Sequence, residues 1–255
     1  MKTTEGETIN NCFVLQRTTG GITIDNCYVP QRTTGGKTIN NCFVPQRTAG
    51  GSLMRMIFFD TETTGIRPGN ICQLSYILVD TTYKPIKTIG KNVFFTVDYI
   101  EPSAEEVHGF SVDALFALSK GKTFDDSYED FIDDFISADI LIGHNVNFDI
   151  KFLTHELKNC GHELTPKHIF CTMKYYKDIC KLYSPRGGYK NPKLSETIEF
   201  LKLNENDINL KSNKYFGDTA NFHDARFDTT ATYLLVTEGI KKGFIPKHYF
   251  SQLVK

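Results

Sequence analysis

An apolar segment that runs directly into two acids is the feature that most constrains this chain. Residues 56–59 read Met-Ile-Phe-Phe, and Asp60 and Glu62 follow within three positions. A short apolar run of this kind predicts a strand buried in a core, with the acids at its end. Side chains two residues apart on a strand leave from the same face, so the two carboxylates are expected side by side. Because burying unpaired charge is costly, this arrangement indicates a bound cation.

Two later segments carry polar residues that match this pair. Residues 143–149 read Gly-His-Asn-Val-Asn-Phe-Asp, and residues 223–228 read His-Asp-Ala-Arg-Phe-Asp. Carboxylate oxygens without sulfur suit a hard divalent ion, Mg²⁺ or Mn²⁺. Asp149 is therefore a candidate ligand, although a carboxylate at a helix start also interacts favourably with the helix dipole. Asp228 is a second candidate, and Asp224, which would share its helix face, is interpreted as the helix N-cap.

The order and spacing of these acids resemble a known enzyme family. An Asp-x-Glu pair, a later Asp and a His-x₄-Asp motif resemble the DnaQ-like 3′-5′ exonucleases of the DEDDh class, which includes the proofreading subunit of bacterial replicative DNA polymerases. In the tyrosine version of this family, a Tyr lies four residues before the last Asp. Here that position is Asp224, whereas His223 lies five residues before Asp228, as the histidine version requires. The resemblance covers about residues 56–243.

The resemblance implies hydrolysis of phosphodiesters with two divalent metal ions. These ions, Mg²⁺ or Mn²⁺, would activate the attacking water and stabilise the negative charge that develops on the leaving 3′-oxygen. Asp60 would bridge the ions, while Glu62 and Asp228 would hold the water-bearing one. Asp149 would act on the second ion. His223 would take the proton from the attacking water as the general base, a role that suits histidine.

Further positions resemble the contacts that this family makes to the terminal nucleotide. A Val-His-Gly segment at residues 107–109 lies between the first two acidic segments. The Thr-Gly pair at the end of the first segment looks like the floor under the nucleotide, where glycine permits close backbone approach. The expected substrate-binding set is Thr63, Thr64, Gly65, His108, Asn145 and Phe148.

The segment from Lys174 to Lys193 is a second candidate for substrate contact. It holds six basic residues and one acid. Its aromatic residues are Tyr175, Tyr176, Tyr183 and Tyr189. Aromatic rings stack on unpaired bases while cations meet phosphates, which is how single strands are held without sequence preference. The alternative is a solvated loop whose tyrosines belong to the core.

The expected function is a metal-dependent 3′-5′ exonuclease that releases nucleoside 5′-monophosphates from single-stranded or frayed DNA ends. An RNA-trimming 3′-5′ exoribonuclease is the alternative, although the motif Asp-Thr-Glu-Thr-Thr-Gly looks more like that of the family members that act on DNA. A catalytically inactive nucleic-acid-binding or polymerase-associated module would lack one of the acids, and none is missing. A DNA polymerase is a candidate partner. The 27 residues after Asp228 include no long tail for one, which favours a stand-alone nuclease or a partner that docks on the folded domain.

From residue 54 the sequence pattern is mixed α/β. Strands are expected at 56–60, 71–79 and 88–97, as an antiparallel meander, and at 139–143. Helices are expected at 123–137, 147–159, 172–182, 194–202 and 224–241. Together with the resemblance, this order implies a ribonuclease H-like mixed β-sheet flanked by helices. The exonuclease domain is expected at residues 54–243 and a C-terminal tail at 244–255.

Composition limits the remaining possibilities. The net charge of −1 gives no global attraction to nucleic acid, so any such binding must be local. No apolar run approaches the ~18 residues of a membrane helix, and the chain does not open on a secretory signal. Seven cysteines in scattered positions fit a reducing cytoplasm. The set Cys160, His162, His168, Cys171 and Cys180 has irregular spacing, which argues against zinc.

The first 53 residues differ from the rest because they repeat. A 15-residue unit occupies residues 3–17, 18–32 and 33–47, and a fourth copy breaks off. Near-identical units this short favour a tandem DNA repeat read in frame, disordered or outside the working protein, which would then start at Met54 or Met56. The alternative is a repeated strand-and-turn module.

Overall fold

The computed structural model describes residues 53–218, 220–250 and 253. The chain divides into two units, residues 1–39 and 40–255, and every described residue belongs to the second. The repeats therefore lie outside the described residues, and both interpretations of them stay predictions.

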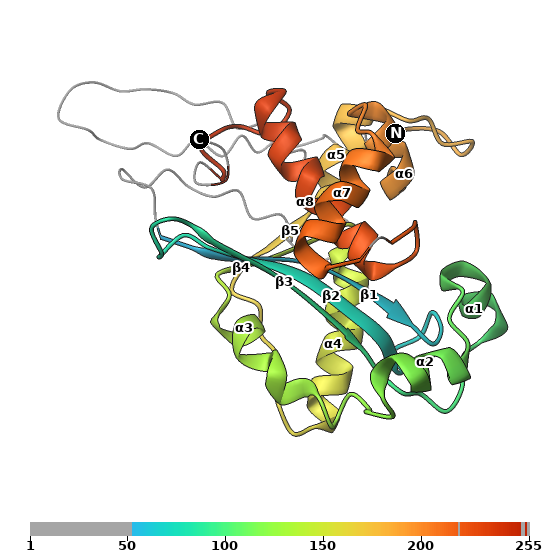
Figure 1. Ribbon diagram of the computed structural model, residues 1–255. Coiled ribbons are helices and arrows are strands. Elements are labelled where there is room, and N and C mark those ends of the chain that lie inside the picture. The colour runs from blue at the N-terminus through green and yellow to red at the C-terminus, as the bar shows by residue number, and fades with distance from the viewer. Residues whose placement is uncertain (1–52, 219, 251–252, 254–255) are drawn as a thin grey trace, which may run out of the picture. The chain divides into compact units, whose positions relative to one another are not determined.

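A five-stranded mixed sheet forms the centre of the described unit (Figure 1). Its strands lie in the order β3 (Lys87–Phe94), β2 (Ile71–Asp80), β1 (Arg55–Thr63), β4 (Ile140–Gly143) and β5 (Ile169–Cys171). The first three in sequence form an antiparallel meander, whereas β4 pairs parallel with β1 and β5 parallel with β4. The meander and the buried fourth strand confirm the sequence prediction. β5 was not expected, because three residues carry no readable periodicity.

Helices cover both faces of this sheet. Their bounds are α1 (Pro102–His108), α2 (Val112–Ser119), α3 (Ile132–Ser137), α4 (Val146–Asn159), α5 (Thr172–Cys180), α6 (Leu194–Phe200), α7 (Glu205–Phe216) and α8 (Ala225–Lys241), with a 3₁₀ turn at Tyr128–Asp130. Helices α5 to α8 lie on one face, and α3 and α4 lie on the other (Figure 1). The predicted α4, α5, α6 and α8 are confirmed within a few residues.

β1 is buried on both faces because a helical layer lies on each side of it. Met56 and Phe58 join the core under α5 to α8, whereas Ile57 and Phe59 join the core under α3 and α4. Side chains alternate along a strand, so this pattern fixes where later residues point. The two acids, which occupy even positions like Met56 and Phe58, therefore leave toward α8.

The helix predicted for residues 123–137 is wrong over its first half. The Thr123 backbone N–H donates to Asp126 Oδ2 at 3.0 Å, as a helix start requires, but the chain continues as a turn and a 3₁₀ turn. Phe131 then has φ −137° and ψ −15°, outside the helical region, and only α3 follows. The Phe131 ring packs against Phe95, with ring centroids 6.2 Å apart. Packing against the sheet therefore overrides the helical periodicity.

Three helices were not expected from the sequence: α1, α2 and α7. Each has a local start signal, namely Pro102 in the first turn of α1, the Ser111 cap of α2 and the Asn204 cap of α7. However, α1 buries none of its residues, and α2 and α7 bury only two each. Short helices without an apolar stripe leave little periodic signal to read.

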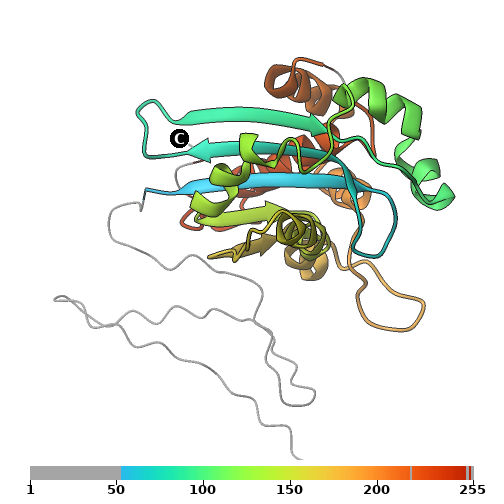
Figure 2. The same ribbon diagram turned by 90° about the horizontal axis from the view of Figure 1, so that it is seen from below.

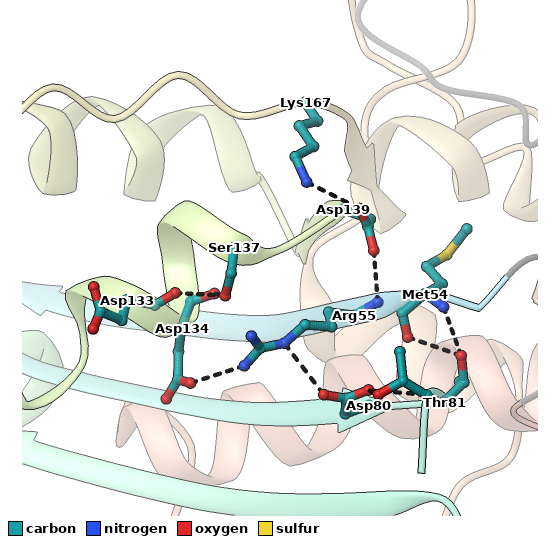
Figure 3. A network of polar contacts seen from close by, with 10 residues as sticks. Met54, Arg55, Asp80, Thr81, Asp133, Asp134, Ser137, Asp139 and Lys167 are labelled. Carbon is teal, nitrogen blue, oxygen red and sulfur yellow. Dashed lines mark hydrogen bonds and ion pairs between the residues drawn. The ribbon is translucent and has the colours of Figure 1, made fainter.

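A polar network fastens the start of β1, at the opposite end of the strand from the acids (Figure 3). The Arg55 guanidinium lies 3.3 Å from Asp80 of β2 and 3.2 Å from Asp134 of α3. The Arg55 backbone N–H also donates to Asp139 Oδ2 at 2.8 Å, just before β4. One residue thus ties β1 to both neighbouring strands and to a covering helix.

Residues from the expected C-terminal tail take part in the core. Ile245 and Phe250 are fully buried, and Tyr249 is 8% exposed. All three belong to the core that also contains α8. The chain after α8 therefore packs at these positions into the core between the sheet and helices α5 to α8.

Candidate functional site

Three carboxylates from two elements meet at the C-terminal end of β1. Asp60 and Glu62 come from the strand, and Asp228 comes from the first turn of α8. One ligand oxygen from each lies within 4.8 Å of the other two. Glu62 and Asp228 are buried, and Asp60 is partly buried. The structure therefore brings together the acids of the first and third sequence motifs.

Asp149 joins this group from the first turn of α4. Its Oδ1 accepts hydrogen bonds from the Thr61 backbone N–H at 3.1 Å and from Thr61 Oγ1 at 2.8 Å. Thr61 lies between Asp60 and Glu62, so the second sequence motif is fastened to the first. Asp149 is also the acid of its helix start, so the two interpretations of this residue are compatible. We name Asp60, Glu62, Asp149 and Asp228 the acidic cluster.

Burial raises the pKa of every carboxyl in the acidic cluster. Burial, followed by the charges of Asp149 and Asp228, raises the pKa of Asp60. Burial also raises the pKa of Glu62, with Asp228 as the next cause. Burial raises the pKa of Asp149 and of Asp228 to about 7 in each case. Four carboxyls that resist ionisation together are what a divalent ion would relieve.

An unpartnered oxygen supports the same interpretation. Asp228 Oδ1 is buried and has no hydrogen-bond partner among the described residues. A buried polar atom without a partner is rare, and an ion is one common explanation. The donor set is made of carboxylate oxygens alone, which fits Mg²⁺ or Mn²⁺. The residues present therefore fit a divalent metal site.

Asp224 does not belong to the acidic cluster. Its Oδ1 accepts hydrogen bonds from Gln73 Nε2 at 3.0 Å and from the Arg226 backbone N–H at 2.9 Å. Its Oδ2 lies 2.6 Å from Arg226 Nη2. These contacts cap α8 and confirm the interpretation of Asp224 as its N-cap. Asp228, one turn later, is thereby the acid that faces β1.

Two histidines flank the acidic cluster. His223 has an exposed side chain and a left-handed backbone with φ 63°, and its backbone N–H donates to the Asp228 carboxyl. His108, at the end of α1, is partly buried, and its Nδ1 accepts from the Phe110 backbone N–H at 3.0 Å. Burial lowers the pKa of His108, against the opposing effects of Thr63 and Glu105.

Thr63, Thr64 and Gly65, the expected floor under the terminal nucleotide, are held by hydrogen bonds among themselves and to Glu101. Thr63 Oγ1 donates to the Gly65 carbonyl at 2.8 Å, and the Glu101 backbone N–H donates to the Thr64 carbonyl at 2.8 Å. A Cβ at Gly65 would lie 2.5 Å from the Glu101 carboxyl group. A larger residue at this position would have to displace the Glu101 side chain, and the close approach of a nucleotide to Gly65 stays a prediction.

The remaining substrate-binding candidates lie at the start of α4. Asn145 is exposed, with a left-handed backbone at φ 72°, and its carbonyl accepts from the Phe148 backbone N–H. Phe148 is partly buried, with its ring centroid 4.7 Å from that of Phe152. Both residues lie within four positions of Asp149. Their contact with a nucleotide stays a prediction.

The sequence interpretation missed the residues that hold the cluster in place. Gln73 is fully buried in β2, and it donates to Asp224 while accepting from the Ala225 backbone N–H. Thr61 clamps Asp149, as described above. A glutamine inside a largely apolar strand is a signal in the sequence for Gln73, whereas Thr61 carries none beyond its place between two acids.

Two further expectations concern metals and membranes. Within residues 53–218, 220–250 and 253, the acidic group is the one set of three or more potential ligands that converges. Cys160, Cys171 and Cys180 are free thiols. None of the helices in the described part of the chain has the length and apolar character needed to cross a membrane.

The chain is similar in sequence to subunits of bacterial DNA polymerases. A stretch of 107 residues is 38% identical to DNA polymerase III subunit epsilon of Rickettsia felis and covers 40% of this chain and 43% of that protein. The same subunit of Buchnera aphidicola is 29% identical over 162 residues, which are 61% of this chain and 65% of that protein. The chain therefore spans less than two thirds of the length of these relatives.

Solved structures show the fold. E. coli Exonuclease I in complex with a 5cy-dT13 oligonucleotide aligns with a TM-score of 0.57 at 15% identity, over 78% of this chain and 42% of that one. Exonuclease I from Methylocaldum szegediense aligns with a TM-score of 0.55 at 15% identity, over 78% of this chain and 42% of that one. The expected ribonuclease H-like fold is thereby confirmed. Residues 57–235, which are most of the chain, match the family RNase_T, described as exonuclease, and the chain belongs to this exonuclease family.

Proposed function

We propose that this protein is a 3′-5′ exonuclease that hydrolyses the terminal phosphodiester of single-stranded or frayed DNA and releases nucleoside 5′-monophosphates. The observation that carries the proposal is the acidic cluster, whose members converge at one end of β1 in a chain of the exonuclease family. The names of the relatives support a DNA substrate, since they include a DNA polymerase subunit and a nuclease in complex with an oligonucleotide. Association with a DNA polymerase is the corresponding proposal for a partner.

The acidic cluster would hold two divalent ions. Asp60 would contact both ions, Glu62 and Asp228 would hold one, and Asp149 would serve the other. When bound, such ions supply a nucleophile from water and cover the charge that builds on the phosphate and the leaving oxygen. Thr61 serves this arrangement by fixing the orientation of the Asp149 carboxyl.

His223 would act as the general base. Its side chain is exposed beside the buried Asp228, and its ring has no hydrogen bond to another described residue. It can therefore accept a proton from an attacking water and pass it to solvent. The left-handed backbone at His223 is uncommon for a residue other than glycine, and such positions are often found at functional sites.

Digestion of end-labelled strands tests the proposed function. Single-stranded DNA and RNA of matched sequence, labelled at the 5′ end, are incubated with Mg²⁺, with and without chelator. We expect a ladder that shortens from the 3′ end of DNA and disappears with chelator. Asp60→Ala is expected to abolish it, and His223→Ala to lower the rate by about 10²–10⁴-fold. Asp207→Ala, which removes an exposed acid on α7, should match the parent.

The possible results separate the alternatives. A ladder on RNA alone would move the protein to the RNA-trimming branch. Equal cleavage by Asp60→Ala and the parent, at matched purity, would disprove the assignment of the site. Cleavage of neither strand by the parent would support the inactive binding module.

A further inference from the structure

A short hairpin between α5 and α6 presents two tyrosines on its strands. Tyr183 and Tyr189 pair as an antiparallel bridge, with ring centroids 5.4 Å apart. The Lys190 backbone N–H donates to the Leu182 carbonyl at 2.8 Å, which closes the base of the hairpin. Two glycines with left-handed backbones form its tip. We name residues 182–190 the tyrosine hairpin.

The exposure of Tyr183 shows that it has no role in the core. Its side chain is 79% exposed, whereas Tyr176 in α5 is fully buried and donates to the Leu235 carbonyl at 2.7 Å. The interpretation of this segment as a loop with core tyrosines therefore holds for Tyr176 and fails for Tyr183. The Tyr183 ring is thus available to a partner, whereas Tyr189 beside it is partly buried, and unpaired bases are a partner that stacks on such a ring.

The charge of the tyrosine hairpin is positive. Arg186 at its tip and Lys181 at its base are exposed, and neither has an ion pair with a described carboxylate. Lys190 is paired with Glu196 of α6. Within a chain of net charge −1, the hairpin and its base are thus a local basic feature beside the exposed ring of Tyr183. Cations for phosphates and rings for bases are the combination that single strands require.

A hydrogen bond fastens the chain after the hairpin to the segment that leads into α4, the helix that carries Asp149. The Pro192 carbonyl, two residues after the hairpin, accepts a hydrogen bond from His144 Nε2 at 3.1 Å. His144 lies between the end of β4 and the start of α4, five residues before Asp149. Figure 2 shows the hairpin projecting beyond the same end of the strands as the turn between β1 and β2. That turn directly follows Glu62 and Thr63, so the hairpin lies toward the end of the sheet at which β1 delivers its acids.

We propose that the tyrosine hairpin binds the single-stranded nucleic acid on the 5′ side of the terminal nucleotide, with Tyr183 stacking on a base and Arg186 and Lys181 contacting phosphates. This inference rests on the proposed function, because it assigns the path of the strand whose 3′ end lies at the acidic cluster. The hairpin then provides affinity for long strands and takes no part in the chemical step.

Steady-state kinetics on strands of two lengths test the inference. The substrates are oligothymidylates of about 12 and about three nucleotides, and the variants are Tyr183→Ala and Arg186→Ala. Stacking on one ring contributes enough that we expect KM for the long strand to rise about tenfold, with kcat within about twofold of the parent. KM for the short strand should not change. Tyr83→Ala, which removes an exposed tyrosine from the turn between β2 and β3, is the matched control.

The outcomes distinguish failure of the hairpin from failure of the proposed function. Hydrolysis of thymidine 5′-monophosphate p-nitrophenyl ester by the parent reports on the site alone, because this ester carries one nucleotide. If the parent cleaves the ester and the hairpin variants keep the parent KM for the long strand, the hairpin proposal is wrong. An equal rise in KM for both strands also contradicts it, since the effect would then lie at the site. If the parent cleaves only RNA, oligouridylates replace the DNA strands in the same comparison.

Discussion

At the scale of single residues, Thr61 decides how Asp149 is presented. Two donors of Thr61 hold one oxygen of that carboxyl, one from the backbone and one from the side chain. Both groups are buried, so the hydrogen bonds are made in a medium of low dielectric constant. The side-chain donor is the part that a substitution can remove while the backbone donor stays.

Thr61→Val is expected to lower kcat by about 10-fold or more, because a hydrogen bond to a charged group contributes about 1.5–3 kcal/mol. Valine keeps the shape of threonine and removes the hydroxyl. Thr61→Ser, which keeps the hydroxyl, should retain most of the activity. The measurement is single-turnover hydrolysis of a labelled strand at saturating Mg²⁺. Equal rates for the valine and serine variants would remove Thr61 from the positioning of Asp149.

The acidic cluster also predicts how stability depends on pH when divalent ions are removed. Burial raises the pKa of Asp228 from 3.8 to about 7 in the folded chain. Between these values the folded state binds more protons than the unfolded state, so the free energy of unfolding falls as pH rises. With chelator present, lowering the pH from 7.5 to 5.5 is expected to raise the Tm of the parent more than that of Asp228→Asn, because asparagine has no carboxyl to titrate.

Thermal unfolding at the two pH values measures this difference. For a domain of this size, 1 kcal/mol corresponds to about 2–4 °C in Tm. Asp207→Asn, which changes an exposed carboxyl, should keep the pH response of the parent. Identical responses of the parent and Asp228→Asn would show that Asp228 titrates normally in the folded chain.

At the scale of elements, the start of α8 is held on the sheet by Gln73. Its side chain donates to Asp224 Oδ1 at 3.0 Å and to Asn92 Oδ1 at 2.8 Å, and it accepts from the Ala225 backbone N–H at 3.1 Å. Asp228 lies one turn further along α8. A buried glutamine of β2 therefore links the sheet to the helix that delivers an acid of the cluster.

Gln73→Leu is expected to lower both stability and kcat. It leaves the buried Ala225 backbone N–H without its acceptor, at a cost of about 1–3 kcal/mol, and it frees the first turn of α8 from β2. Tyr176→Phe is the matched control. It removes a buried hydrogen bond from Tyr176 in α5 to the Leu235 carbonyl of α8, ten residues after Ala225. Both variants should unfold at lower temperature, and only Gln73→Leu should lose kcat. If both keep the parent kcat at a temperature where they are folded, Gln73 is structural only.

The elements differ in how well the sequence predicts them. β1 was predicted because its apolar residues have no polar interruption before Asp60, and α8 because Asp224 caps a long periodic segment. The helix predicted from Thr123 was wrong because Phe124 and Phe131 have helical spacing in the sequence, while their rings pack together and against Phe95 from a turn. The acids could be found because their chemistry is rare in a core. Their holding contacts could not, since these join residues 88 and 151 positions apart.

At the scale of the whole described unit, charge is distributed unevenly. The acidic cluster lies at the C-terminal end of β1, the basic tyrosine hairpin projects beyond the same end of the strands, and the net charge of the chain is −1. A strand would therefore be held by a few local contacts, with little long-range attraction. Binding that depends on few phosphates loses less affinity with added salt than binding to a broad basic surface.

The alternation along β1 has a consequence for how this domain can change over time. Even-numbered residues of β1 point to one face of the sheet, and these include Met56, Phe58 and the two acids. Odd-numbered residues such as Thr61 point to the other face. A single inserted or deleted residue between Arg55 and Asp60 would exchange the two sets, turning carboxylates into the core of α3 and α4 and hydrophobic side chains toward the cluster. The distance from the Arg55 network to the acids is thus a fixed count. Substitutions that keep the alternation of β1 leave its acids facing α8, whereas a change in the number of residues before Asp60 turns them to the opposite face.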